Sequence, residues 1–353
     1  VLKHYNETWS LPKIAKGAGA SIVGKVTKGN YVLKHNGVKV CDAKGSDITS
    51  GLMYNRPFKP RKTTFKEPNL PMPRDLNKTL LELLAHENIA SRLPIYESYD
   101  RNVQAISVIE AGHGDAGVIA PFRNIEDVPE EFHKVGVALS TDANPLYGQI
   151  DPYWQAANAV VESARNVAAV GATPWCITDC LNYGNPEKSD QMWELVAGIE
   201  GITDALKGLG LRGSEPEEVT FKKAKKGAAK AAYRSLEGSI KKPEKIIKKG
   251  AKLPLTCISG NVSFYNQSSY EGPVFPTPTI VMLGILDKKN RMTLDFKQEG
   301  DLIYLIGEMR DDIACSEYLY SYHKVKLSPA PFFDLEEEFK VQQALSAIIK
   351  KGL

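Results

Sequence analysis

Two short apolar runs, residues 175–177 and 255–258, have the pattern of buried β-strands. Each run passes directly into a segment rich in Gly, Asn, Asp and Ser, at residues 178–186 and 259–266. These residue types favour turns, expose backbone N–H groups and supply short oxygen ligands. The pattern predicts two strand ends suited to a phosphate group and a hard cation. Taken singly, each segment is explained more simply as an ordinary turn rich in Asn and Asp.

The rest of the pattern predicts a mixture of strands and helices without the regular alternation of a parallel Rossmann sheet. Asn36-Gly37 separates two apolar-polar runs and is typical of a β-hairpin turn. Capping signals predict helices that begin after Asp75, after Asp151, at Ser189 or Asp190, and after Asp334. Further strands are expected at residues 103–109, 117–122, 136–141, 279–286 and 301–307. The fold class expected from these elements is α+β.

The composition is that of an ordinary globular protein, with 42% apolar and 25% charged residues in 353 positions. This length is sufficient for two or three domains. No apolar run approaches the length of a membrane helix, and the N-terminus has no signal-peptide pattern. The five cysteines are dispersed without metal-binding spacing, which favours a reducing, cytoplasmic location.

A strongly basic segment lies between Lys222 and Lys252. It holds eleven lysines and one arginine against two glutamates, a net charge of +10 in a chain whose total is +3. We interpret residues 211–252 as an insertion. A solvated excursion explains it, and so does docking to an acidic partner or a polyanion. No aromatic-and-basic recognition module accompanies the charge, so nucleic acid is not favoured as a partner.

Several strings occur in an order that resembles phosphoribosylformylglycinamidine synthase, a glutamine-dependent amidotransferase of de novo purine synthesis. The resemblance extends over most of the chain, and the string Thr178 to Pro186 makes it specific. The other matching pieces are Gly112 to Ala116, Thr141 to Pro145, Asp151 to Tyr153, Glu162 to Asn166, Ala168 to Ala172, Ser259 to Asn266, Phe275 to Thr279 and Ser316 to Leu319.

The resemblance implies the fold of the aminoimidazole ribonucleotide synthetase superfamily. Its N-terminal domain has a predominantly antiparallel sheet with helices on one face, followed by an α/β C-terminal domain. The family's synthetase has two homologous halves, and this chain resembles the end of the first half and most of the second. We therefore expect a tail at residues 1–61, a linker at 62–74, the second-half N-terminal domain at 75–287 with the basic insertion, and the start of the C-terminal domain at 288–353.

The implied activity is the ATP-dependent conversion of formylglycinamide ribonucleotide to formylglycinamidine ribonucleotide with ammonia. By motif position, Asp179 and Gly260 resemble ATP-binding residues, Asn261 a Mg²⁺ ligand and Ser263 a substrate-binding residue. Three further positions match Mg²⁺ ligands of a second, structural nucleotide site: Asp115, Glu162 and Asn166. On residue type alone, Glu162 and Asn166 could equally form hydrogen bonds with neighbouring loops. No catalytic residue is identified, because the family's catalytic histidine belongs to a segment that this chain lacks.

The implied partners are the glutaminase subunit that supplies ammonia, the small bridging subunit and the missing synthetase domains. A non-catalytic scaffold subunit of the same fold is the alternative function. Leu146 stands where the family has Arg, His113 and Gln155 replace glycines, and Ala314-Cys315 replaces Gly-Gly. The loss of a cation at Leu146 and the bulk of His113 both argue against nucleotide binding at the Asp115 site.

Overall fold

The computed structural model describes residues 1–9, 16–50, 54–61, 63–210, 254–310 and 312–352. The predicted basic insertion at 211–252 therefore lies outside the described residues. Two compact units are present, Val1–Asn55 and Arg56–Leu353. The domain boundaries expected near residues 61, 74 and 287 stay predictions.

The first unit contains the predicted hairpin. Strands β1 (Tyr31–His35) and β2 (Val38–Ala43) pair antiparallel around Asn36-Gly37. Both turn residues have positive φ angles, 49° and 83°, as a type I′ hairpin turn requires. Helices α1 (Leu2–Trp9) and α3 (Gly45–Thr49) lie on either side of the hairpin in the sequence. Most described residues of this unit are exposed, so it has little core of its own.

The second unit is built on a six-stranded sheet with the order β3-β4-β5-β10-β6-β7. All neighbouring strands are antiparallel except β6 and β7, which are parallel. The expected antiparallel sheet is therefore confirmed. The strands are β3 (Ser107–Ile109), β4 (Gly117–Ile119), β5 (Val135–Asp142), β6 (Thr173–Asn182), β7 (Thr256–Ser263) and β10 (Thr277–Asp287). A separate small ribbon pairs β8 (Gln267–Ser268) with β9 (Gly272–Pro273).

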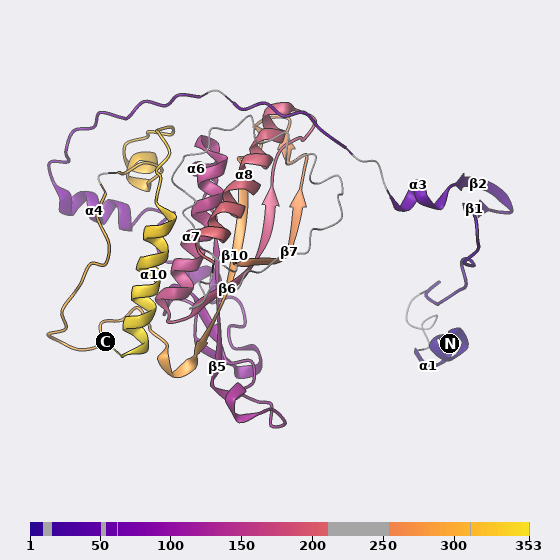
Figure 1. The fold of residues 1–353 in the computed structure, drawn as a ribbon, viewed down its shortest axis with the longest axis horizontal. Coiled ribbons are helices and arrows are strands. Elements are labelled where there is room, and N and C mark those ends of the chain that lie inside the picture. Colours follow the sequence, from indigo (N-terminus) through magenta and orange to yellow (C-terminus); the bar gives the residue numbers. More distant parts are fainter. Residues whose placement is uncertain (10–15, 51–53, 62, 211–253, 311, 353) are drawn as a thin grey trace, which may run out of the picture. The chain divides into compact units, whose positions relative to one another are not determined.

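Helix α7 (Pro152–Ala169) packs on one face of the sheet, against β5 and β10, and α8 (Ser189–Gly208) packs on α7. Figure 1 shows α6, α7, α8 and α10 gathered on this one side of the strands. The alternation of buried and partly exposed positions along β10 identifies the covered face, because Ile280 and Met282 are fully buried and join the core formed with α7. The expected packing of helices on one face is confirmed.

The helix starts follow the capping signals. Asp75 accepts a backbone hydrogen bond at the start of α4 (Leu76–Leu84), Asp151 accepts two at the start of α7, and Asp334 accepts two at the start of α10 (Leu335–Lys350). Asn144 caps α6 (Pro145–Ile150) in the same way. The remaining short elements are α5 (Leu93–Tyr96), 3₁₀ turns at Val103–Ala105, Glu130–Lys134 and Lys288–Asn290, and a π-helical turn at Tyr318–Tyr322. No described helix is long and apolar enough to cross a bilayer.

The expected strands differ from the structure in three respects. Residues 301–307 form no strand, and most of their apolar side chains are exposed. Residues 103–105 form a 3₁₀ turn, so that β3 begins only at Ser107. The third difference concerns the site, because β6 and β7 run on through the polar segments that we expected to be turns. In each case the apolar run alone did not determine the length of the strand.

Residues 56–61 belong to the second unit. Lys59 donates a backbone hydrogen bond to the Ser189 carbonyl, and Arg61 reaches the Glu194 carboxylate of α8 at 3.1 Å. Arg61 also donates to the carbonyl of Gln149. Only 9% of the Glu194 side chain is exposed, and this burial, followed by the charge of Asp190, raises its pKa from 4.5 to about 7 in spite of Arg61.

The raised pKa of Glu194 predicts a pH-dependent stability. Between pH 4.5 and 7 the folded chain holds a proton on Glu194 that the unfolded chain releases. The free energy of unfolding should therefore fall as pH rises through this window, by up to about 3 kcal/mol. In Glu194→Gln this contribution should be absent. Urea denaturation of both proteins at pH 5, 6, 7 and 8 measures the difference, and parallel pH profiles would contradict the prediction.

Candidate functional site

The two motif segments lie side by side as neighbouring parallel strands. Asp179 of β6 pairs with Gly260 of β7, and Cys180 pairs with Asn261. An irregularity precedes these pairs, because Ile177 is opposite Cys257 whereas Thr178 is opposite Ser259. Ile258 is thus an extra residue in β7, a β-bulge. Strand β7 is at the edge of the described sheet, and most of its residues are exposed.

The Asp179 carboxylate lies directly over Gly260. A Cβ atom added to Gly260 would overlap both carboxylate oxygens, so the missing side chain is what leaves room for them. Asp179 is half-buried, while Gly260 is exposed. A carboxylate beside bare backbone is therefore open to a ligand at the edge of the sheet.

Asn261 and Ser263 present their side chains on the opposite face from Asp179. Asp179 is opposite Ile280 of β10, which faces the helices, whereas Asn261 is in register with Cys180 and Thr279 on the other face. Ser263 is two residues further along β7 and shares that face. We expected the two strand ends to lie side by side with all these groups on one face; the ends do lie side by side, but the expectation of a single face is wrong. The bulge and the continued strand produce an alternation that two separate turns would not have.

The ends of β6 and β7 are held by the turn that follows β6. The Tyr183 amide donates to the Ser263 carbonyl at 3.1 Å, and the Tyr265 amide donates to the Gly184 carbonyl at 2.9 Å. Gln191 of α8 accepts from the backbone of Asn185 and so anchors this turn on the helix. The backbone around Ser263 is therefore fixed although β7 is an edge strand.

A second group of polar residues lies where β5 ends beside α7. Asn166 donates to Asp142 at 2.9 Å, and Asn158 donates to Glu162 at 3.1 Å. Burial raises the pKa of both carboxyls, and the charge of Asp142 raises that of Glu162 further. Two half-buried carboxylates close enough to act on each other are a donor set suited to a cation. Asp142 was not among the predicted site residues, although it belongs to the matching string at 141–145.

The third predicted member of this group, Asp115, is exposed and does not line the cavity beside Glu162 and Asn166. It precedes β4 by two residues, and Gly117 pairs with Leu139, so it lies at the same end of the sheet as Asp142. Among the described residues, no three His, Cys, Asp or Glu side chains are grouped as a metal site. The structure brings Glu162 and Asn166 together, but not Asp115 with them.

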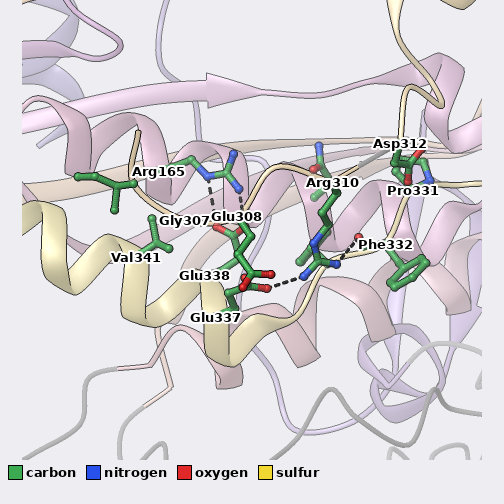
Figure 2. A pocket seen from close by; sticks show the side chains of 13 residues that line it. Arg165, Gly307, Glu308, Arg310, Asp312, Pro331, Phe332, Glu337, Glu338 and Val341 are labelled. Carbon is green, nitrogen blue, oxygen red and sulfur yellow. Dashed lines mark hydrogen bonds and ion pairs between the residues drawn. The ribbon is translucent and has the colours of Figure 1, made fainter. Parts of the chain in front are cut away.

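A larger cavity of about 460 Å³ adjoins this group and shares Asn158, Arg165 and Pro331 with it. Figure 2 shows Arg165 and Glu338 of α10 pointing toward each other, with Arg310 and Glu337 paired alongside. Arg310 also approaches the Phe332 ring, with 6.0 Å to its centroid. The cationic groups of this cavity are thus already engaged by carboxylates.

Two departures from the family pattern are accommodated in the fold. Gln155 is fully buried on α7, and its amide nitrogen donates to the Pro278 carbonyl at 3.3 Å, so it ties the helix to β10. Cys315 lines the cavity beside Glu162, and burial followed by the nearby Asp312 raises its pKa to about 12. Its thiol is therefore protonated at neutral pH. Neither residue was predicted to have these contacts.

The sequence is similar to known proteins across almost its whole length. Residues 113–213 match the N-terminal domain of AIR synthase related proteins. Over 320 residues, 90% of this chain, 41% of positions are identical to phosphoribosylformylglycinamidine synthase subunit PurL of Methanothrix thermoacetophila. Over this length the chain is similar to the corresponding part of PurL proteins. PurL of Methanocaldococcus jannaschii is 32% identical over 344 residues. This chain spans 36% and 40% of the length of these two PurL proteins.

Solved PurL structures agree with the fold. Phosphoribosylformylglycinamidine synthase II of Thermotoga maritima matches 93% of this chain with a TM-score of 0.50 and 17% identity, and the match covers 39% of that chain. T. maritima PurL in complex with FGAR gives the same TM-score at 18% identity, with 93% and 38% of the two chains covered. The fold predicted from the resemblance, an α+β domain of the AIR synthase type, is therefore confirmed.

Proposed function

We propose that this chain is part of a PurL synthetase that converts formylglycinamide ribonucleotide to formylglycinamidine ribonucleotide. In this reaction ATP phosphorylates the formamide oxygen, and ammonia then displaces the phosphate. The protein has to position two substrates, neutralise phosphate charge and exclude water, and it requires no protein nucleophile for this. Glutamine would be the amido donor, through a separate glutaminase subunit.

The observation that carries the proposal is the paired arrangement of β6 and β7. Asp179 over Gly260 on one face, and Asn261 with Ser263 on the other, are four motif residues within two neighbouring strands. We propose that Asp179 and Gly260 bind ATP. We propose that Ser263 donates a hydrogen bond to formylglycinamide ribonucleotide. Since the groups occupy two faces, we infer that the ligands meet around β7, the edge strand of the described sheet, where Gly260 leaves the backbone bare.

Mg²⁺ fits this arrangement when phosphate and water supply most of its ligands, because the protein then needs to contribute only one or two oxygens. Asn261 is exposed and can give one amide oxygen from the edge strand. The bound ion would neutralise phosphate charge during transfer. For the second nucleotide site we retain Glu162 and Asn166 as Mg²⁺ ligands, add Asp142, and propose Asp115 from the neighbouring loop.

The partners that we propose are the glutaminase subunit, the small bridging subunit and the synthetase segments that the PurL relatives have in addition. One solved structure from T. maritima is that of PurLQS, whose name includes PurL. A cytoplasmic location accords with five cysteines that form no disulfide. The roles of residues 1–61 as a first-half tail and of 288–353 as the start of a C-terminal domain belong to the same proposal.

A three-variant comparison on β7 tests the proposal. In the assembled enzyme supplied with ammonium ions, Asn261→Ala should raise the Mg²⁺ concentration for half-maximal turnover, and Ser263→Ala should raise KM for formylglycinamide ribonucleotide, each by about 10-fold, the scale of one hydrogen bond or ligand to a charged group. Ser259→Ala is the matched control, because Ser259 shares the exposed face and lies two residues before Asn261. It should leave both constants unchanged.

The outcome also separates the enzyme from the scaffold alternative. If the assembly with the native chain turns over and the three variants do not differ, the assigned residues are wrong. If the assembly is inactive while the chain still associates with its partners, the non-catalytic scaffold is favoured.

A further inference from the structure

The Cys257 thiol lies beside the Asp179 carboxylate. Its Sγ atom is 3.2 Å from Asp179 Oδ2 and 3.1 Å from the Ser259 carbonyl oxygen. Cys257 enters β7 immediately before the bulge, opposite Ile177, and therefore on the same face as Asp179. The thiol thus contacts the carboxylate from one side while Gly260 borders it on another.

We propose that Cys257 is a positioning residue that holds the Asp179 carboxylate over Gly260 for the phosphate end of a nucleotide. This inference rests on the proposed function of Asp179 and goes beyond it, because it gives a role to a cysteine outside the matching strings. The thiol does not touch the ligand. It donates a hydrogen bond to one carboxylate oxygen and so leaves the other oriented toward the open edge of β7.

The protonation of Cys257 agrees with a donor role. Partial burial of the sulfur, the hydrogen bond to Asp179 and the charge of Asp179 raise its pKa to about 11. At neutral pH the group is a thiol that can donate, and it is a weak nucleophile. A deprotonated sulfur would repel the carboxylate instead. Cys257 therefore resembles a serine in its role more than a reactive cysteine.

The first experiment tests the contact itself. Alkylation of Cys257 by iodoacetamide at pH 9, followed by mass spectrometry of the Cys257 peptide, measures the fraction of thiolate. In Asp179→Ala the acceptor and its charge are lost, so the rate should rise at least ~3-fold through the lowered pKa. In the same samples Cys180, which is on the opposite face, should react at an unchanged rate. Equal Cys257 rates in both proteins would overturn the contact.

The second experiment tests the role. Dissociation constants of the Mg²⁺ complex of a non-hydrolysable ATP analogue are measured by calorimetry on the full chain and its variants. Cys257→Ala should weaken binding ~5-fold, the scale of one hydrogen bond, and Cys257→Ser, which retains a donor, should restore it to within ~2-fold. Cys180→Ala is the matched control. Thermal denaturation of the four proteins should be similar, since Cys257 is exposed.

These outcomes distinguish the inference from the function on which it rests. If the native chain binds the nucleotide and Cys257→Ala binds equally well, the positioning role is wrong and the nucleotide site stands. If serine does not restore what alanine loses, hydrogen bonding is not the reason. If the native chain does not bind the nucleotide while Asp179→Ala still accelerates alkylation, the contact is real, and both the nucleotide site and the positioning role fall.

Discussion

Asp179→Asn should reduce the ammonia-dependent turnover of the assembled synthetase at least ~100-fold, the scale expected for one preorganised electrostatic group. The asparagine has nearly the same shape and still fits over Gly260, so the change removes charge with little steric effect. Glutamine hydrolysis by the partner subunit should continue at its normal rate, because that chemistry belongs to another polypeptide. Turnover with ammonium chloride and glutaminase activity are measured on the same preparation.

A neighbouring carboxylate provides the control for this experiment. Asp190 is exposed in the first turn of α8, and Asp190→Asn removes the same charge from the same region of the protein. It should change turnover less than ~2-fold, in keeping with the small energies of exposed charges. If Asp179→Asn retains turnover within a few-fold of the native protein, Asp179 is not part of the ATP site.

Gly201→Ala should destabilise the second unit by ~2–3 kcal/mol, the upper range for overpacking a core. Helices α7 and α8 approach so closely at Gly201 that an added Cβ atom would overlap the carbonyl oxygen of Tyr153. This neighbour is backbone of a helix and cannot rotate away, so the two helices have to separate. Because α7 contacts the sheet and α8 contacts the sheet mainly through α7, the whole helical layer is affected.

Chemical denaturation followed by tryptophan fluorescence measures this effect. Gly117→Ala is the matched control, since Gly117 lies in β4 of the same unit and an added Cβ atom meets nothing within 4 Å. It should change stability by less than ~1 kcal/mol, as expected for an unhindered glycine. Equal stabilities of the two variants would show that the helices can repack around the extra methyl group.

The helices and the general class of the fold could be predicted because their signals are local. Asp75, Asp151 and Asp334 each precede a helix and accept hydrogen bonds from its first backbone amides, so a few adjacent residues determine where the helix begins. The hairpin at Asn36-Gly37 is local in the same sense. We expected the ends of β6 and β7 to lie side by side because a nucleotide, Mg²⁺ and the substrate need their protein groups close together, and the pairing of the two strands confirms this.

The faces of the candidate site could not be predicted, because they depend on contacts between distant strands. Whether Asp179 and Asn261 share a face is decided by the pairing of β6 with both β10 and β7, and by the extra residue Ile258. The local composition of each segment favoured a turn, and the hydrogen-bonded ladder overrode it. Cys257 was missed for the same reason, since only the pairing of the two strands brings it to Asp179.

The bulge at Ile258 has a consequence for the orientation of the site residues that follow it in β7. The chain enters β7 from a long connection after α8, and the bulge comes before the residues that carry the site. A one-residue slip normally turns every later side chain to the other face of a sheet. Here the extra residue Ile258 is left unpaired in the bulge. Beyond it, Thr178 to Asn182 pair regularly with Ser259 to Ser263. The orientation of Asn261 and Ser263 is therefore determined by their pairing with β6 beyond the bulge, and not by the alternation of side chains along the part of β7 that precedes it.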